Sequence, residues 1–226
     1  MSDTADTGHG LSIHRSDALT DGIYAVAMTL LVIDLKLPEH AGLQSSNELW
    51  HALYHLIPKF FAWAISFCVL AMFWVGHHRA HRHLRRADGP MVALNIAQLG
   101  FVSLLPFACS LAGEHPGLVA QSVYSFDLAM LSVLALLTIR YIHRHPELCA
   151  LPMSRAAHLS ACVRIGALIV ISIAAVFIQW ALPQYPGIGN SAFALMSLVS
   201  PLSRRIERAM LAEPIAELDS AGSETD

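Results

Sequence analysis

Three aspartates flank a strongly apolar segment near the N-terminus, in an arrangement that would suit the passage of cations through a membrane. Asp17 and Asp21 precede the uncharged run over residues 22–33, and Asp34 follows it. Carboxylates at the two ends of such a run would collect cations, while the apolar middle would control their passage by excluding water. A helix that only anchors a protein in a membrane has no need of three acids.

The apolar run contains a regular stripe of branched side chains. Val26, Leu30 and Ile33 are spaced i, i+4 and i+7, so they fall on one side of a helix. A ring of such side chains would form the narrow, water-excluding part of a pore. A stripe of small residues lies beside it, formed by Gly22, Ala25 and Thr29. Small residues allow close helix packing, either around a shared axis or within one subunit, and the pattern fits both.

Each aspartate also has a simpler explanation. Asp17 either lines a vestibule that concentrates cations or is an acid favoured by the helix dipole or by a salt bridge. Asp21 lies deeper in the segment, and we expect it in a packed polar network because a buried charge needs a partner. Asp34 either contributes to an acidic mouth or pairs with Lys36.

The composition predicts the membrane helices that must position these residues. Of the 226 residues, 55% are hydrophobic and 14% are charged, which is too apolar for an ordinary soluble domain. The net charge of −3 gives no indication of nucleic-acid binding. Several runs approach the roughly 20 residues that a helix needs to cross a bilayer. We predict an all-α membrane protein with six spans, over residues 17–35, 60–76 (extended through 77–86), 92–112, 119–142, 161–182 and 188–202.

The distribution of basic residues predicts the orientation of these spans. Arginines precede the first span, follow the second and the sixth, and surround the loop between the fourth and the fifth, whereas the opposite loops hold Lys36 and Lys59. The positive-inside rule then places both termini in the cytoplasm, which requires an even number of spans. We divide the chain into a cytoplasmic segment over 1–14, a transmembrane domain over 15–203 and a disordered, acidic cytoplasmic tail over 204–226.

A histidine-rich cluster over residues 77–86, HHRAHRHLRR, offers a different kind of site. Membrane oxidases bind two iron ions through several such boxes, but the only other histidine cluster on the predicted cytoplasmic side is His143 and His145, with His158 nearby. The cysteines and histidines also lack the Cys₂His₂ spacing of a zinc site. We favour a cytoplasmic helix extension, with no bound metal and no enzymatic activity, and a pH-sensing role stays open.

The first span resembles a known family. RSDALTDGIYAVAMTLLVIDLKLP, over residues 15–38, resembles the first-helix signature of the bacterial relatives of the endosomal–lysosomal potassium channel, the transmembrane protein 175 family. Arg15, Asp21, Gly22 and Thr29 match this signature, while Leu19 and Thr20 stand where Phe and Ser are usual. The resemblance covers the first half of the chain and continues through Trp74, His77 and His78, the spacing from Asp88 to Asn95, and LLPF over residues 104–107.

The resemblance implies a homotetramer of six-helix subunits in which the first helix lines a central pore. It maps the hydrophobic constriction onto Val26, Leu30 and Ile33, and a neighbouring threonine onto Thr29. Val26 departs from the Ile or Leu usual at its position, which would widen the constriction. The resemblance also implies a structural network that holds the first span against the third, formed by Arg15, Asp21, His78 and Asn95.

We therefore expect a potassium-permeable channel in a prokaryotic plasma membrane. Its partners would be other copies of the chain, lipid and the permeant K⁺, with no cofactor and no carbonyl-lined filter. The alternatives are a secondary transporter, which would be built from inverted repeats, a proton-conducting pathway through the same pore and, less favoured, a histidine-box membrane oxidase.

Overall fold

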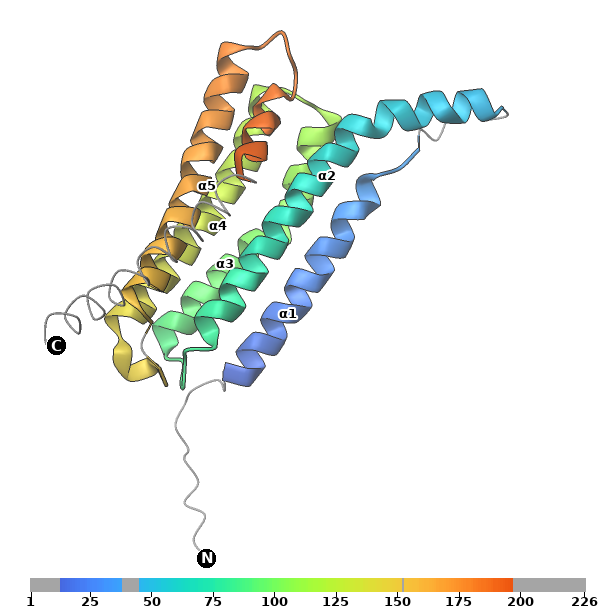
Figure 1. The fold of residues 1–226 in the computed structure, drawn as a ribbon. Coiled ribbons are helices and arrows are strands. Elements are labelled where there is room, and N and C mark those ends of the chain that lie inside the picture. Colours follow the sequence, from blue (N-terminus) through green and yellow to red (C-terminus); the bar gives the residue numbers. More distant parts are fainter. Residues whose placement is uncertain (1–12, 38–44, 152, 197–226) are drawn as a thin grey trace, which may run out of the picture.

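The computed structural model is a bundle of long helices, and it describes residues 13–37, 45–151 and 153–196 (Figure 1). The described residues contain no β-strand, only an isolated bridge between Leu84 and Cys149. The helices are α1 (Ile13–Leu30), which continues into the 3-10 turn η1 (Leu31–Asp34), α2 (Ser46–His81), α3 (Gly89–Glu114), α4 (Leu118–Arg144), the short η2 (Pro146–Leu148), α5 (Arg155–Ala181) and the 3-10 segment η3 (Ile188–Leu195).

Five of the described helices are long and apolar enough to cross a membrane. Each of the first five predicted spans lies within one of these helices, with at most two residues beyond the helix end. The prediction of a multi-pass, all-α membrane protein is therefore confirmed. The sixth predicted span, over 188–202, begins as the 3-10 segment η3 and not as an α-helix. Its remainder and the predicted tail over 204–226 lie outside the described residues.

Side chains at the helix starts explain why three of the helices begin where they do. Asp88 accepts a hydrogen bond from the backbone N–H of Met91 over 3.1 Å at the start of α3. Ser154 caps α5 in the same way, and Ser45 with Glu48 forms a reciprocal capping box at the start of α2. Such caps satisfy backbone donors that have no partner within the helix.

The helix α2 is longer than the sequence suggests. The region over 38–58 would suit a short interfacial helix separate from the second span, yet Ser46–His81 is one helix of 36 residues with Pro58 inside it. At 1.5 Å per residue it measures about 54 Å, well beyond the thickness of the hydrocarbon core. Its N-terminal part projects past the end of α1 (Figure 1), and carries the exposed aromatic residues Trp50 and Tyr54, which suit a membrane interface.

The helices α3, α4 and α5 pack together with α2, and α1 lies at the edge of the bundle against α2 and α3 (Figure 1). The bundle core is made of aliphatic side chains that have no exposed surface, including Leu70, Val102, Leu105, Leu128 and Leu168. Because α1 is at the edge, one of its faces packs inward and the other has no neighbour among the described residues.

Candidate functional site

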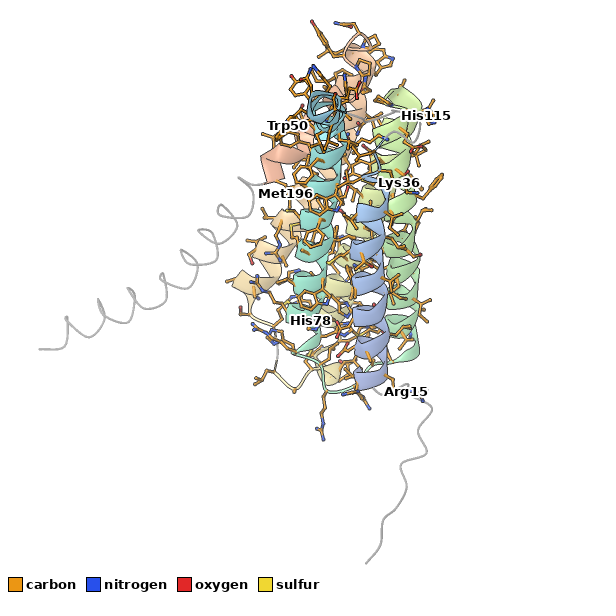
Figure 2. All side chains as sticks on the ribbon, turned by 90° about the vertical axis from the view of Figure 1, so that its right-hand side faces the viewer. Arg15, Lys36, Trp50, His78, His115 and Met196 are labelled. Carbon is orange, nitrogen blue, oxygen red and sulfur yellow. The ribbon has the colours of Figure 1, made fainter. Side chains whose placement is uncertain are left out.

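The two faces of α1 differ in what they contact. Its inward face is buried against α2 and α3 and consists of Ser16, Thr20, Tyr24, Ala27 and, just beyond the helix end, Leu31. Its outward face carries the predicted constriction residues: the exposed fractions are 56% for Val26, 41% for Leu30 and 50% for Ile33. Figure 2, viewed from the α1 side, shows this helix between the labelled Arg15 and Lys36. The apolar stripe of α1 therefore points away from its own bundle.

The outward face also includes an apolar hollow of about 310 Å³ between α1 and α3. Its lining includes Gly22, Val26 and Leu30 on α1 and Ser103 on α3. A Cβ atom added at Gly22 would meet no atom within 4 Å. The space beside this glycine is therefore open, and no close packing within the chain requires a glycine there. Thr29 lies on the same exposed face, where its hydroxyl donates to the carbonyl of Val26 over 2.8 Å.

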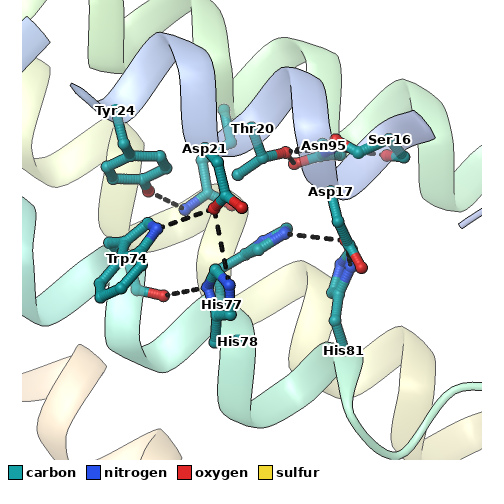
Figure 3. A network of polar contacts seen from close by, with 11 residues as sticks. Ser16, Asp17, Thr20, Asp21, Tyr24, Trp74, His77, His78, His81 and Asn95 are labelled. Atoms are coloured by element: carbon teal, nitrogen blue, oxygen red, sulfur yellow. Dashed lines mark hydrogen bonds and ion pairs between the residues drawn. The ribbon is translucent and has the colours of Figure 1, made fainter. Parts of the chain in front are cut away.

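A buried polar cluster holds α1 against α3. The side-chain amide of Asn95 donates hydrogen bonds to the hydroxyls of Ser16 and Thr20, each over 3.0 Å. The Thr20 hydroxyl in turn donates to the backbone carbonyl of Ser16 over 2.9 Å (Figure 3). Asn95 is thus satisfied at the polar start of α1, where the sequence suggests it would lie. Interhelical hydrogen bonds of this kind are a common means of joining membrane helices.

Asp21 joins α1 to α2. Its Oδ1 accepts a hydrogen bond from the indole Nε1 of Trp74 over 2.9 Å and lies 3.5 Å from Nε2 of His78 (Figure 3). The predicted partnership of Asp21 with His78 is present, but two details of the expected network are wrong. His78 belongs to α2, so this half of the network fastens the first helix to the second, and the Asp21 side chain is half exposed and not deeply buried.

The remaining predicted site residues lie apart from these contacts. Arg15 is exposed and forms no ion pair with another described residue, and its structural role stays a prediction. The side chain of Asp34 lies outside the described part of the structure, although its backbone ends η1. Lys36, its suggested partner, is exposed.

Asp17 contacts two histidines that the sequence did not connect with it. Its Oδ1 lies 2.6 Å from Nδ1 of His81 and 3.7 Å from Nε2 of His77 (Figure 3). A signal for this contact is present in the sequence: Asp17 and Asp21 are four residues apart, and so are His77 and His81. Because α1 and α2 run antiparallel, two such pairs come into register, but only the packing of the helices shows which acid meets which histidine.

The first half of the chain is similar to a family of channels. Residues 15–106 match the family model described as endosomal/lysosomal potassium channel TMEM175. A protein named potassium channel from Streptomyces collinus is 32% identical over 124 residues, which are 53% of this chain and 59% of that protein. One of the same description from Chamaesiphon minutus is 36% identical over 115 residues, 49% of this chain and 56% of that protein. The matches thus span somewhat over half the length of these relatives.

A vertebrate relative carries a different description. The human protein named endosomal/lysosomal proton channel TMEM175 is 35% identical over 108 residues, 46% of this chain and 21% of its own length.

Solved structures extend the similarity beyond the first half. The crystal structure of a lysosomal potassium-selective channel TMEM175 homolog from Chamaesiphon minutus has a TM-score of 0.65 at 25% identity, covering 84% of this chain and 97% of that one. A variant of the potassium channel MtTMEM175, solved in complex with a nanobody fusion protein, has a TM-score of 0.54 at 14% identity, covering 96% and 98%, and shares the fold alone.

Proposed function

We propose that this chain is a member of the TMEM175 family and forms a potassium-permeable cation channel whose pore is lined by α1. The observation that carries the proposal is the outward stripe of Val26, Leu30 and Ile33, which is exposed while the opposite face of α1 is fastened to the bundle. The family match over residues 15–106 includes the whole of this helix, apart from its first two residues, and its bacterial relatives are named potassium channels.

The apolar stripe would act as a constriction. An ion that passes a ring of Val26, Leu30 and Ile33 must lose or deform its hydration shell, because these side chains offer no oxygen ligands. Potassium holds its water less strongly than sodium does, so a moderate preference for potassium arises without a carbonyl-lined filter. The exposed hydroxyl of Thr29 donates its hydrogen to a backbone carbonyl, so its oxygen can still accept. Such an oxygen suits a partly dehydrated cation.

A single chain cannot enclose such a pore, since its apolar stripe lies on the outer surface of the bundle. We propose a homotetramer in which the α1 helices of neighbouring copies face a shared axis. The open space at Gly22 and the apolar hollow between α1 and α3 are the surfaces that a neighbouring copy would cover. A neighbouring copy in this position would cover the apolar lining of the hollow.

We also propose that the chain lies in a prokaryotic plasma membrane with both termini in the cytoplasm. Arg15 and His78 lie toward one end of the bundle, and Lys36, Trp50 and His115 lie toward the other (Figure 2). The arginine-rich segment after His78 and the arginines around the loop between α4 and α5 belong to the same end as Arg15. By the positive-inside rule this end faces the cytoplasm. K⁺ enters the proposal only as the permeant ion, and we assign no catalytic activity.

Flux through reconstituted liposomes tests the proposal. Wild-type protein is expected to carry a larger flux under a potassium gradient than under a sodium gradient, and Leu30→Ala is expected to alter that flux. Leu137→Ala is a matched control, because Leu137 is a similarly exposed leucine on α4, away from the stripe. Equal effects of the two substitutions would show that the constriction does not lie on α1. A wild-type protein that carries neither ion would contradict the proposal of a channel.

Proton passage through the same pore is the second candidate, because the vertebrate relatives are named proton channels. With equal potassium on both sides and a pH difference across the bilayer, a proton pathway gives a reversal potential that follows the pH difference. A potassium pathway gives a reversal potential near zero under the same conditions.

A further inference from the structure

We propose that Asp17, His77 and His81 form a binding site for a divalent transition-metal ion such as Zn²⁺, placed where α1 begins and α2 ends. The site is distinct from the proposed constriction, and it does not depend on the proposed function. It uses a carboxylate from one helix and two imidazoles from the next, a combination that the histidine-rich sequence alone did not indicate.

The three side chains converge on a small volume. One ligand atom of each residue lies within 4.8 Å of the other two. Oδ1 of Asp17 is 2.6 Å from Nδ1 of His81 and 3.7 Å from Nε2 of His77. Zinc binds nitrogen and carboxylate oxygen at about 2.0–2.2 Å, which places tetrahedral ligands about 3.3 Å from one another. Small side-chain rotations are therefore enough to bring all three atoms to binding distance.

The histidines have polar atoms for which the described residues provide no partner. Both imidazoles are only 5% exposed, and Nε2 of His77 and Nε2 of His81 have no hydrogen-bond partner in the described part of the chain. His81 faces Asp17 with Nδ1, so the site concerns the unpaired Nε2 of His77 and not that of His81. Buried polar atoms are nearly always paired, so this nitrogen of His77 requires an explanation. A metal ion supplies one, because it binds neutral imidazole nitrogen directly.

The charges of the cluster also favour a bound cation. The imidazole centroids of His77 and His81 are 3.7 Å apart, so two protonated rings would repel each other at close range in a poorly solvated site. A single divalent ion between two neutral rings and the Asp17 carboxylate avoids this repulsion. It also neutralises the carboxylate, which otherwise sits beside the two buried rings.

The ligand set determines which metals fit. Imidazole nitrogen with one carboxylate suits Zn²⁺, Co²⁺, Ni²⁺ and Cu²⁺, whereas Mg²⁺ and Ca²⁺ prefer oxygen ligands alone. Two histidines four residues apart on a helix present their rings on the same face, as in helical zinc motifs. Three protein ligands leave a fourth position for water, and His77 lines a neighbouring cavity of about 40 Å³, large enough to hold water.

The site also has an entrance. The Asp17 side chain is 34% exposed, so an ion can reach the carboxylate from the surface before it contacts the buried rings. The adjacent pair of Asp21 and His78 provides a contrast: it is half exposed, offers one imidazole, and that imidazole also contacts the backbone carbonyl of Trp74. The structure thus separates a three-ligand site from an ordinary acid–histidine contact one turn away.

A Co²⁺ titration of tag-free, full-length protein in detergent tests the proposal, followed by visible absorption and by competition with Zn²⁺. The wild type is expected to bind one ion per chain with the ligand-field absorption of a nitrogen- and oxygen-ligated site. His81→Gln is expected to bind at least about tenfold more weakly, because it removes a direct ligand. His83→Gln is the matched control, since His83 belongs to the same histidine-rich segment but not to the cluster.

Thermal unfolding provides a second readout, because a ligand that binds the folded state alone raises its stability. Zn²⁺ is expected to raise the unfolding midpoint of the wild type and of His83→Gln, and to leave that of His81→Gln nearly unchanged. If His81→Gln does not fold, Asp17→Asn at the partly exposed position carries the same expectation. The proposal is overturned if the wild type shows no saturable binding, or if ligand and control variants bind equally well.

Discussion

The indole of Trp74 donates a hydrogen bond to the carboxylate of Asp21 over 2.9 Å, and this contact links the first helix of the bundle to the second. It sits beside the contact between Asp21 and His78, so one carboxylate receives two side chains from consecutive turns of α2. Because hydrogen bonds to a charged group are stronger than neutral ones, this carboxylate is a principal attachment point of α1.

Replacing Trp74 with Phe is expected to weaken this attachment while keeping an aromatic ring. The substitution removes the N–H donor, and the half-exposed carboxylate regains water in its place, so we expect a loss of about 1 kcal/mol in stability. Thermal unfolding in detergent measures it. Trp50→Phe is the control, because Trp50 is highly exposed in the projecting part of α2, and an equal loss there would contradict the assignment.

Asn95→Ala is expected to destabilise the protein by about 2 kcal/mol. The substitution removes two hydrogen bonds and leaves the buried hydroxyls of Ser16 and Thr20 without their shared donor. Denaturation in mixed micelles measures the change. Ser103→Ala on the same helix is the control, since the exposed Ser103 hydroxyl donates to the carbonyl of Gly100 within its own helix and to no other described residue. A loss at Asn95 no larger than at Ser103 would show that the buried cluster adds little.

Val26→Ile is expected to reduce potassium flux severalfold without unfolding the subunit. The extra methylene extends from an exposed position of the α1 stripe, so it narrows the proposed constriction and touches no packed core. Liposome flux assays measure the effect against Val170→Ile, an exposed valine on α5. Unchanged flux in Val26→Ile would exclude this position from the narrow part of the pore.

Gly22→Val is expected to disrupt assembly more than folding. A Cβ atom at Gly22 meets nothing within 4 Å inside the chain, and the same holds for Gly166 on α5. If a neighbouring copy packs on Gly22, the added side chain blocks its approach. Light scattering after size exclusion is expected to give a smaller oligomer for Gly22→Val than for the wild type. Gly166→Val should assemble normally, and identical masses for all three proteins would argue against α1 as the assembly surface.

The sequence predicts this fold well where hydrophobic runs are long and uninterrupted. The five long helices follow from such runs, because the length of an apolar segment is set by the membrane it must cross. The sequence predicts helix bounds less well where a helix continues past its expected end. The region over 38–58 suits an interfacial helix separate from the second span, but α2 continues through Pro58, since neighbouring groups in a helix can accommodate a missing backbone donor.

Contacts between helices were partly predictable. The links of Asp21 to His78 and of Asn95 to the first helix both followed from a family resemblance. The contact of Asp17 with His77 and His81 required more, because it depends on how far α2 extends and on which of its faces meets α1. Periodicity gives the faces of each helix but not the rotation of one helix against another.

The polar contacts of α1 are concentrated near its beginning, at Ser16, Asp17, Thr20, Asp21 and Tyr24. From Ala27 onward the helix is held by apolar packing alone among its described contacts with the rest of the bundle. If α1 tilted as a rigid body, it would therefore rotate about its first turns, and its far end would move most. Measured from Thr20 at 1.5 Å per residue, Ile33 lies about 20 Å along the axis and Val26 about 9 Å. A tilt of about 10° would displace Ile33 by about 3 Å and Val26 by roughly half of that, so such a motion would widen the stripe mainly at Ile33.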